Sequence, residues 1–201
     1  MMGDMDLSII VVNWNTQEML SQCLKSVDKT VRASDCLEVE TIVVDNASAD
    51  GSVQMVREQF PWTRLIENME NLGFARANNQ ALKLARGNKL LLLNPDTVST
   101  EGAIELLLGV LDEDLKTAIV GAQLLNADGS LQPSSGAFPS LWSELPLINR
   151  RLNHKHKPAS VSVLGQDRIV RSVDWVSGAC LMIKREACDA IGLLDESFWL
   201  Y

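Results

Sequence analysis

The sequence predicts an α/β fold with a mostly parallel sheet flanked by helices. Short apolar runs rich in Ile, Val and Leu recur in the first half of the chain at intervals of ~30 residues, and segments with helical spacing of apolar residues separate them, which is typical of βαβ units. Three of these runs end in polar side chains, at Asn13, at Asp45 and Asn46, and at Asn94 and Asp96. Ligands of such sheets bind beyond the carboxyl ends of the strands, so this pattern also indicates a binding site.

The first predicted strand is LSIIVV at 7–12, a continuous apolar run of the kind found in strands covered on both faces. Apolar side chains at helical spacing follow it, with Thr16 as the expected N-cap residue. A second strand is predicted at 39–44. The helix after it extends to about Phe60 and is ended by Pro61.

Three more strands are predicted in the same half. TRLIEN at 63–68 forms the third, and the helix that follows is closed by Gly87. KLLLLN at 89–94 forms the fourth, and the next helix ends near Asp112. TAIVGA at 117–122 forms the fifth.

The second half is less regular. Residues 123–172 have turn-forming clusters and little periodicity, and the Asp-Gly pair at 128–129 predicts a hairpin. Strand and helix patterns return after residue 172. We expect one domain over the whole chain, with a regular half at 1–122 and an irregular half at 123–201.

The composition is that of an ordinary globular protein, with 201 residues, 46% hydrophobic and 22% charged. The net charge of −8 argues against broad binding of nucleic acid. No apolar run is long enough to cross a bilayer, and the acidic start does not resemble a signal peptide, so we expect a cytoplasmic protein. No CxxC spacing occurs, and we interpret the cysteines as ordinary thiols in a reducing compartment: Cys23, Cys36, Cys180 and Cys188.

The Asn94-Pro95-Asp96 sequence allows two interpretations. Asn, Pro and Asp are common turn residues, so Asp96 could simply cap the next turn. A carboxylate at the end of a strand can also hold Mg²⁺ or Mn²⁺, which take oxygen ligands and share them with a diphosphate.

Asp45 follows a buried strand directly, and such an acid can accept hydrogen bonds from a base or a ribose. Turn chemistry explains most of the polar residues after it but does not require the acid itself. Further along, Gly73 permits a left-handed backbone at the start of a helix. Asn78 and Asn79 near that start either cap the helix or face a bound anion.

Two other features remain open. The basic sequence RRLNHKHK at 150–157 contains His154 and His156; we favour a solvated loop over a metal site or a contact with an anionic membrane. Trp175 lies beside an apolar strand, where an indole ring either stacks on a sugar or packs in a core.

Six segments, in order, resemble family 2 glycosyltransferases with the GT-A fold, in particular the bacterial rhamnosyltransferase-like enzymes of cell-surface polysaccharide synthesis. The segments are SIIVVNWN, IVVDNASADGS, NLGFARANNQAL, LLLLNPDT, WVSGACLMIKRE and IGLLDESFWLY, and they cover nearly the whole chain. The resemblance implies a nucleotide-diphospho-sugar transferase fold with a Rossmann-like sheet, incomplete at its C-terminus. Residues 1–122 would bind the nucleotide sugar, and 123–201 would face the acceptor.

The resemblance also implies site residues. Asp96 takes the place of the last acid of the family's DxD metal motif, and Asn94 replaces the first, so the cofactor would be Mg²⁺ or Mn²⁺. Trp175, Ser177 and Gly178 would border the sugar and the acceptor. The implied donor site consists of Val12, Asn13, Trp14, Asp45, Gly73, Arg76, Asn79, Asn94 and Asp96.

The catalytic base is expected elsewhere. In the family, the segment that resembles LLDESFWLY continues into a Glu-Asp pair whose Asp is the general base, whereas this sequence stops at Tyr201. Asp195 and Glu196 belong to the preceding segment and do not replace it. We therefore expect the chain to bind nucleotide but to turn over poorly on its own.

The resulting hypothesis is an inverting sugar transferase, in which an acceptor hydroxyl attacks the anomeric carbon of a UDP- or dTDP-sugar. The sugar would be rhamnose and the acceptor a saccharide or a lipid-linked saccharide, with peripheral contact at the inner face of the membrane and no nucleic acid. Two alternatives are a non-catalytic nucleotide-sugar or carbohydrate-binding module, and a flavodoxin-like or receiver-type domain that takes up phosphoryl groups at Asp45.

Overall fold

The computed structural model describes residues 5–32, 37–138, 159–163 and 169–199. The predicted basic loop with His154 and His156, and Cys36, lie outside the described residues. The chain divides into two compact units, one formed by Met1–Ala122 with Gly178–Tyr201 and the other by Gln123–Ser177.

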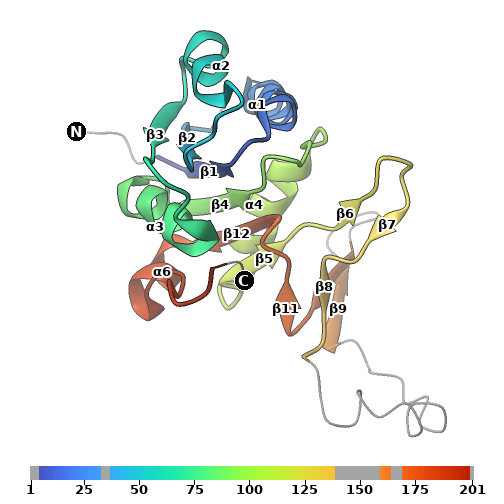
Figure 1. Cartoon of the computed structure of the whole chain (residues 1–201). Coiled ribbons are helices and arrows are strands. Elements are labelled where there is room, and N and C mark those ends of the chain that lie inside the picture. Colours follow the sequence, from blue (N-terminus) through green and yellow to red (C-terminus); the bar gives the residue numbers. More distant parts are fainter. Residues whose placement is uncertain (1–4, 33–36, 139–158, 164–168, 200–201) are drawn as a thin grey trace, which may run out of the picture. The chain divides into compact units, whose positions relative to one another are not determined.

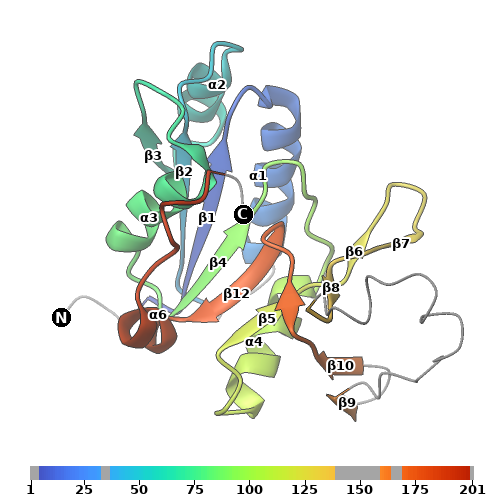
Figure 2. The ribbon, with the colours of Figure 1, turned by 60° about the horizontal axis from the view of Figure 1, so that its bottom comes forward.

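The first unit is built on a six-stranded sheet with the order β3-β2-β1-β4-β12-β5 (Figure 1). The first four strands in that order are parallel, whereas β12 is antiparallel to both of its neighbours, β4 and β5. The arrowheads of β1 and β4 point the same way in Figure 2, so their carboxyl ends share an edge. The strands are β1 Leu7–Asn13, β2 Val39–Asp45, β3 Arg64–Glu67, β4 Lys89–Leu93, β5 Ile119–Gly121 and β12 Cys180–Lys184.

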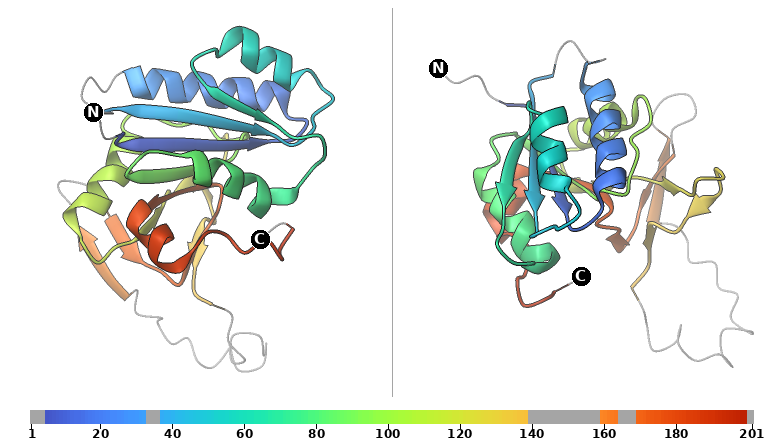
Figure 3. Two further views of the ribbon diagram at one scale, coloured as in Figure 1. Left: turned by 90° about the vertical axis from the view of Figure 1, so that its left-hand side faces the viewer. Right: turned by 45° about the horizontal axis from the view of Figure 1, so that its top comes forward.

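Helices cover both faces of this sheet (Figure 3). Side chains alternate between the faces along each strand, so Leu91 of β4 packs on one side and Leu92 on the other. Residues of α1, α2 and α4 form the core on the first side, and residues of α3 and α6 pack on the second. The helices are α1 Gln17–Arg32, α2 Ser52–Gln59, α3 Gly73–Leu84, α4 Ala103–Glu113 and α6 Arg185–Ile191.

The predicted α/β class and the mostly parallel sheet are confirmed, and the five predicted strands of the first half correspond to β1 to β5. One feature differs from the expected division at residue 122. Residues 178–201 return to the first unit and do not continue the irregular half. The reason is β12, whose Met182 is fully buried and which forms ladders with β4 and β5 at once.

A hydrogen-bonded cluster ties the amino edge of the sheet together. The Ser8 hydroxyl donates to Glu40 (2.7 Å), and the Arg86 guanidinium binds the second oxygen of Glu40 through Nε and Nη2 (3.1 and 3.0 Å). Partial burial alone would raise the pKa of Glu40, but hydrogen bonds from Ser8 and Arg86 hold it below its ordinary value. Gly87 lies so close to β1 that an added Cβ would be 2.4 Å from the Ser8 nitrogen.

The second unit contains short antiparallel pairs, β6 with β7, β8 with β11 and β9 with β10. The predicted Asp-Gly hairpin is present: Gly129 has a φ of 83°, and the Asn126 amide donates to the Ser130 carbonyl (2.8 Å). The strands are β6 Leu124–Leu125, β7 Leu131–Gln132, β8 Ser135–Gly136, β9 Ala159–Val163, β10 Ile169–Ser172 and β11 Trp175–Val176. Across the described parts of the chain, no helix combines the length and the apolar character needed to span a membrane.

Candidate ligand site at the carboxyl edge of the sheet

A buried polar pair joins the ends of β1 and β2. Asn13 and Asp45 are partners in the parallel ladder and are 0% and 2% exposed. The Asn13 amide donates to one carboxylate oxygen of Asp45 (2.8 Å), and the Ser48 backbone N–H donates to the other (2.8 Å). Asn13 also donates to the Ser48 hydroxyl (3.0 Å) and accepts from the Thr16 hydroxyl (2.6 Å). Both oxygens of Asp45 are therefore used within the protein.

Hydrogen bonds connect the loop after β1 to the loop after β2. The Asn15 side chain accepts from the Ala49 amide (2.8 Å), and the Gln17 amide donates to the Asp50 carboxylate (2.8 Å). Asn15 and Ala47 adopt φ values of 53° and 63°. A left-handed alanine costs ~1–3 kcal/mol and persists only where its surroundings enforce it, and such positions cluster at functional sites. These hydrogen bonds fix the loop that carries Trp14, which is 55% exposed.

A network of carboxamides extends this edge toward α3. Asn46 is 2% exposed; it accepts from Asn68 (2.8 Å) and donates to Asn71 (3.2 Å) and to the Gly73 carbonyl (3.4 Å). Asn68 also exchanges two hydrogen bonds with Gln80 of α3 (both 2.9 Å). The network fixes the start of α3, where Gly73 has a φ of 77°.

Two of the predicted donor residues on α3 contact another part of the first unit. The Asn79 carboxamide is 3% exposed and bonds to Leu194 and Glu196, and Arg76 lies 3.7 Å from the Glu196 carboxylate. The structure thus brings Gly73, Arg76 and Asn79 together on one stretch of helix and places residues 194–199 against it.

Asn94 and Asp96 lie at the end of β4, the strand next to β1. The Asn94 backbone is fixed by its amide, which donates to Ala179 (2.9 Å), and by its carbonyl, which accepts from the Thr97 hydroxyl (2.7 Å). Asp96 is exposed at the tip of this turn. Beneath the turn, burial raises the pKa of the Cys23 thiol to about 12.

The fit of a divalent metal depends on these oxygens. No group of three or more His, Cys, Asp or Glu side chains that could hold a metal occurs among the residues that the structure describes. Asp45 is buried and engaged, so Asp96 is the exposed acid at these strand ends. One carboxylate suits Mg²⁺ or Mn²⁺ that takes its remaining ligands from a diphosphate and from water, and it does not suit a cage made of protein alone.

The predicted acceptor residues are divided between the units. Trp175 and Ser177 belong to the second unit, where the Trp175 indole N–H donates to the Ala137 carbonyl (3.1 Å) and the Ser177 amide donates to Ser134 (2.8 Å). Gly178 belongs to the first unit, and its Cα faces the ring of Phe74.

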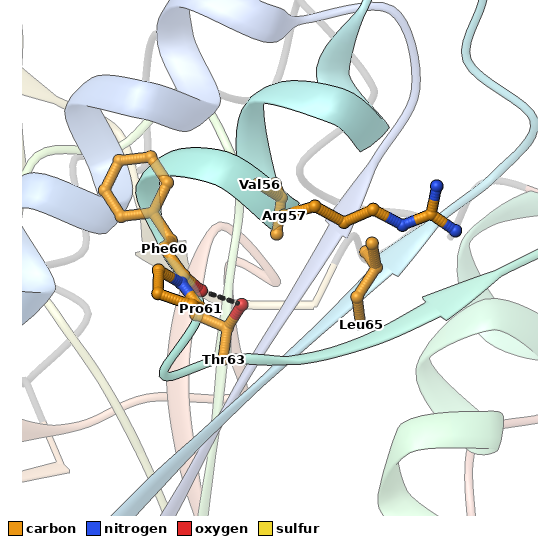
Figure 4. Close-up of a pocket in the computed structure, with 6 residues that line it drawn as sticks. All are labelled: Val56, Arg57, Phe60, Pro61, Thr63 and Leu65. Carbon is orange, nitrogen blue, oxygen red and sulfur yellow. Dashed lines mark hydrogen bonds between the residues drawn. The ribbon is translucent and has the colours of Figure 1, made fainter.

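A shallow pocket lies away from these residues, in the turn that connects α2 to β3 (Figure 4). Its volume is about 220 Å³. Because α2 runs back from the carboxyl end of β2, this turn belongs to the amino edge of the sheet, and the pocket is no part of the candidate site. It is lined by Val56, Arg57, Phe60, Pro61, Thr63 and Leu65.

The carboxamide network and the contacts of residues 194–199 were not predicted from the sequence. Asn46 and Asn68 follow successive strands and read as turn residues. A sequence signal did exist at Asn78 and Asn79, because adjacent asparagines lower helix propensity. The structure accounts for both: Asn78 bonds to the Phe74 carbonyl of its own helix (2.9 Å), and Asn79 bonds to a distant segment.

Comparison with known proteins identifies relatives over most of the chain. The family model described as glycosyl transferase family 2 matches residues 8–192. An N-acetylglucosaminyl-diphospho-decaprenol L-rhamnosyltransferase of Mycobacterium tuberculosis is 24% identical over 218 residues, covering 97% of this chain and 66% of the relative. The low-salt glycan biosynthesis hexosyltransferase Agl10 of Haloferax volcanii is 25% identical over 202 residues, covering 98% of this chain and 58% of the relative.

Solved structures share the fold. A mannosyltransferase of Pyrobaculum calidifontis, in complex with GDP-Man and Mn²⁺, has a TM-score of 0.61 at 20% identity, covering 94% of this chain and 47% of that one. TarS residues 1–349 of S. aureus, in complex with UDP, has a TM-score of 0.65 at 20% identity, covering 97% and 52%. The chain thus spans roughly half to two thirds of the length of these four proteins.

Proposed function

The chain belongs to glycosyl transferase family 2, and we propose that it moves a sugar from a nucleotide-diphosphate sugar to a saccharide or lipid-linked acceptor. The observation that carries this proposal is the set of strand ends at the carboxyl edge. The buried pair of Asn13 and Asp45 and the exposed Asp96 follow three neighbouring strands. Ligands of α/β sheets bind at such an edge.

The nucleoside would lie over the loops after β1 and β2. Trp14 is exposed there and offers a ring for stacking on a base, with Val12 beside it at the strand end. Asn13 and Asp45 would support this surface from below, because their side chains bond to each other and to the loop. The resemblance also assigns Gly73, Arg76 and Asn79 to the donor site, and this assignment remains a prediction.

Asp96, with Asn94 beside it, would hold Mg²⁺ or Mn²⁺ against the diphosphate. Bound there, the cation supplies positive charge that neutralises the departing nucleotide diphosphate. The Mn²⁺ in the complex of the mannosyltransferase from Pyrobaculum calidifontis supports a divalent cation in this fold. Trp175, Ser177 and Gly178 are proposed to border the sugar and the acceptor.

The finer assignments rest on the relatives. Rhamnose is proposed as the sugar on the resemblance and on the name of the rhamnosyltransferase of Mycobacterium tuberculosis. UDP or dTDP as the nucleotide and inversion at the anomeric carbon are proposed on the resemblance alone. The lipid carrier in the name of that enzyme supports a lipid-linked acceptor and peripheral contact at the inner face of a membrane.

Neither Asp195 nor Glu196 is proposed as the base that deprotonates the acceptor. The side chains of Asp195 and Glu196 already have partners in this structure: Asp195 accepts from the Ser197 hydroxyl (2.6 Å), and Glu196 accepts from Asn79 (2.9 Å). We expect this chain alone to bind nucleotide and to transfer sugar slowly.

Calorimetric titration of UDP and dTDP, with Mn²⁺ and again with EDTA, tests the proposal. We expect binding that requires the metal, with a preference for one base that identifies the donor. Asp96→Ala should lose the nucleotide binding that requires the metal. Asp112→Ala, an exposed acid on α4 whose side chain is 64% accessible, is the matched control and should bind as the wild type does. A wild-type chain that binds neither nucleotide would contradict the proposal.

A further inference from the structure

Residues Leu194–Trp199, here called the strap, run from α6 along α3 toward the carboxyl ends of β1 and β4 (Figure 2). The Asn79 carboxamide binds both the N–H and the carbonyl of Leu194 at the start of the strap, as a peptide group of a neighbouring strand would. Its Oδ1 accepts from the Leu194 amide (3.0 Å), and its Nδ2 donates to the Leu194 carbonyl (2.8 Å) and to the Glu196 carboxylate (2.9 Å). Three bonds from a side chain that is 3% exposed make a specific attachment.

Glu196 gives the strap a second, weaker attachment. Its carboxylate lies 3.7 Å from Arg76 Nε and 4.0 Å from Lys83 Nζ. Arg76, Asn79 and Lys83 are spaced by three and four residues, so they share one face of α3. The two ion pairs are largely exposed and contribute little, so the Asn79 bonds carry the attachment.

The far end of the strap is seated on the first turn of α3. The Trp199 carbonyl accepts from the Phe74 amide (2.9 Å), one of the donors that a helix N-terminus leaves unpaired. The Trp199 side chain packs on Gly73: a Cβ at Gly73 would lie 2.8 Å from the Trp199 carbonyl oxygen and 3.1 Å from two ring atoms. Any side chain larger than that of glycine at this position would displace the ring.

The contact of Trp199 with the first turn of α3 adjoins the candidate site. The Gly73 carbonyl accepts from Asn46, which directly follows Asp45. A continuous series of contacts therefore links the buried pair at the ends of β1 and β2 to Trp199. Although its position is fixed, the Trp199 side chain remains 58% exposed, as does that of its neighbour Phe198.

A strap that only covered α3 would be expected to turn its large aromatic side chains inward, since buried apolar area is what stabilises such a segment. Here the attachment is made by backbone and polar groups, and the rings are left outside. An indole with a fixed position and a free surface is suited to stacking on the apolar face of a pyranose.

We propose that Trp199 contacts a sugar ring in the transfer site and that Asn79 is the positioning residue that holds it there. This inference rests on the proposed function and extends it to a residue that the sequence did not indicate. The ring belongs either to the sugar of the nucleotide donor or to the saccharide acceptor.

The test compares ligands with and without a sugar. Calorimetry with Mn²⁺ measures UDP, UDP-N-acetylglucosamine and dTDP-rhamnose, and then N-acetylglucosamine with UDP already bound, for the wild type and for Trp199→Ala. We expect Trp199→Ala to bind UDP as the wild type does and to lose affinity for a sugar-bearing ligand by on the order of tenfold. Loss for the nucleotide sugars identifies the donor, and loss for N-acetylglucosamine identifies the acceptor.

Trp62→Ala is the matched control, because Trp62 is 40% exposed and lies at the amino edge, and it should change none of these affinities. Sugar affinities of Trp199→Ala equal to those of the wild type, with nucleotide still bound, would overturn this inference alone. A wild-type chain that binds no nucleotide would overturn the proposed function and this inference with it.

The positioning role of Asn79 has its own measurements. Asn79→Ala should speed hydrogen exchange at the Leu194 amide and lower the affinity for the sugar-bearing ligand. In the double variant Asn79→Ala with Trp199→Ala, the loss of sugar affinity should be no larger than in Trp199→Ala alone, because Asn79 acts through Trp199. A double variant that lost clearly more sugar affinity than Trp199→Ala would mean that Asn79 acts on the sugar directly, and the positioning role would be wrong.

Discussion

Two alanine variants, Asp45→Ala and Asp96→Ala, compare the contributions to stability of a buried acid and an exposed acid. The two acids lie at the ends of β2 and β4, the strands that flank β1. Asp45 is 2% exposed and accepts two hydrogen bonds of 2.8 Å, one from Asn13 and one from the Ser48 amide. Hydrogen bonds to a charged group contribute about 1.5–3 kcal/mol each, so the loss of two in Asp45→Ala should cost about 3–6 kcal/mol of unfolding free energy. Asp96 is exposed, and Asp96→Ala should change stability by less than about 0.5 kcal/mol.

Urea unfolding followed by circular dichroism measures both values by linear extrapolation. Asp45→Asn adds an internal check, because its amide group must face one of the two donors and can accept from only the other. We expect it to fall between the wild type and Asp45→Ala. The reasoning fails if Asp45→Ala lies within about 1 kcal/mol of the wild type, since loss of two charge-assisted bonds cannot cost so little in a buried site.

Three further predictions concern the rest of the first unit. Gly87→Ala should unfold at a clearly lower temperature than the wild type, because its Cβ would be 2.4 Å from a backbone nitrogen of β1, whereas Gly109→Ala, in open space on α4, should not; equal melting temperatures would contradict this. The pKa of Glu40 in the folded protein lies below its ordinary value of 4.5. The stability that the ionised Glu40 contributes is therefore complete above pH 4.5 and is lost as pH falls through the folded pKa. Glu40→Gln should therefore be less stable than the wild type at pH 7, with the gap narrowing below pH 4.5, and a constant gap would refute the assignment. Because burial raises the pKa of the Cys23 thiol to about 12, iodoacetamide at pH 8 should modify the half-buried Cys188 before Cys23 in the folded protein, and equal rates of modification of these two cysteines by mass spectrometry would count against it.

Strands β1, β2 and β4 could be predicted because each contains a continuous apolar run that ends in a polar residue or turn. The position of β12 could not. Its sequence CLMIK reads as a buried strand wherever it pairs, and nothing in it indicates an antiparallel place between β4 and β5. Propensity and periodicity report local structure, whereas this pairing depends on a contact with a distant part of the chain.

The same limit applies to the candidate site. The polar residues at the ends of the strands could be recognised from their spacing, and the structure gathers Asn13, Asp45 and Asp96 at one edge. The sequence could not show which of them face solvent, because Asp45 is buried against Asn13, a hydrogen-bond partner 32 residues away in the chain. The partner of Asn79 lies 115 residues away, so its role was visible only as an unexplained loss of helix propensity.

The place of β12 in the sheet has a consequence for how the chain is made. Strand β4 is complete at Leu93, but its second neighbour begins only at Cys180. At a synthesis rate of ~5–20 residues per second, the leucine-rich β4 waits about 5–20 seconds with one edge unpaired. An unpaired apolar edge is a template for association with other chains. During translation this edge of β4 is therefore open to association with other chains until β12 has been made.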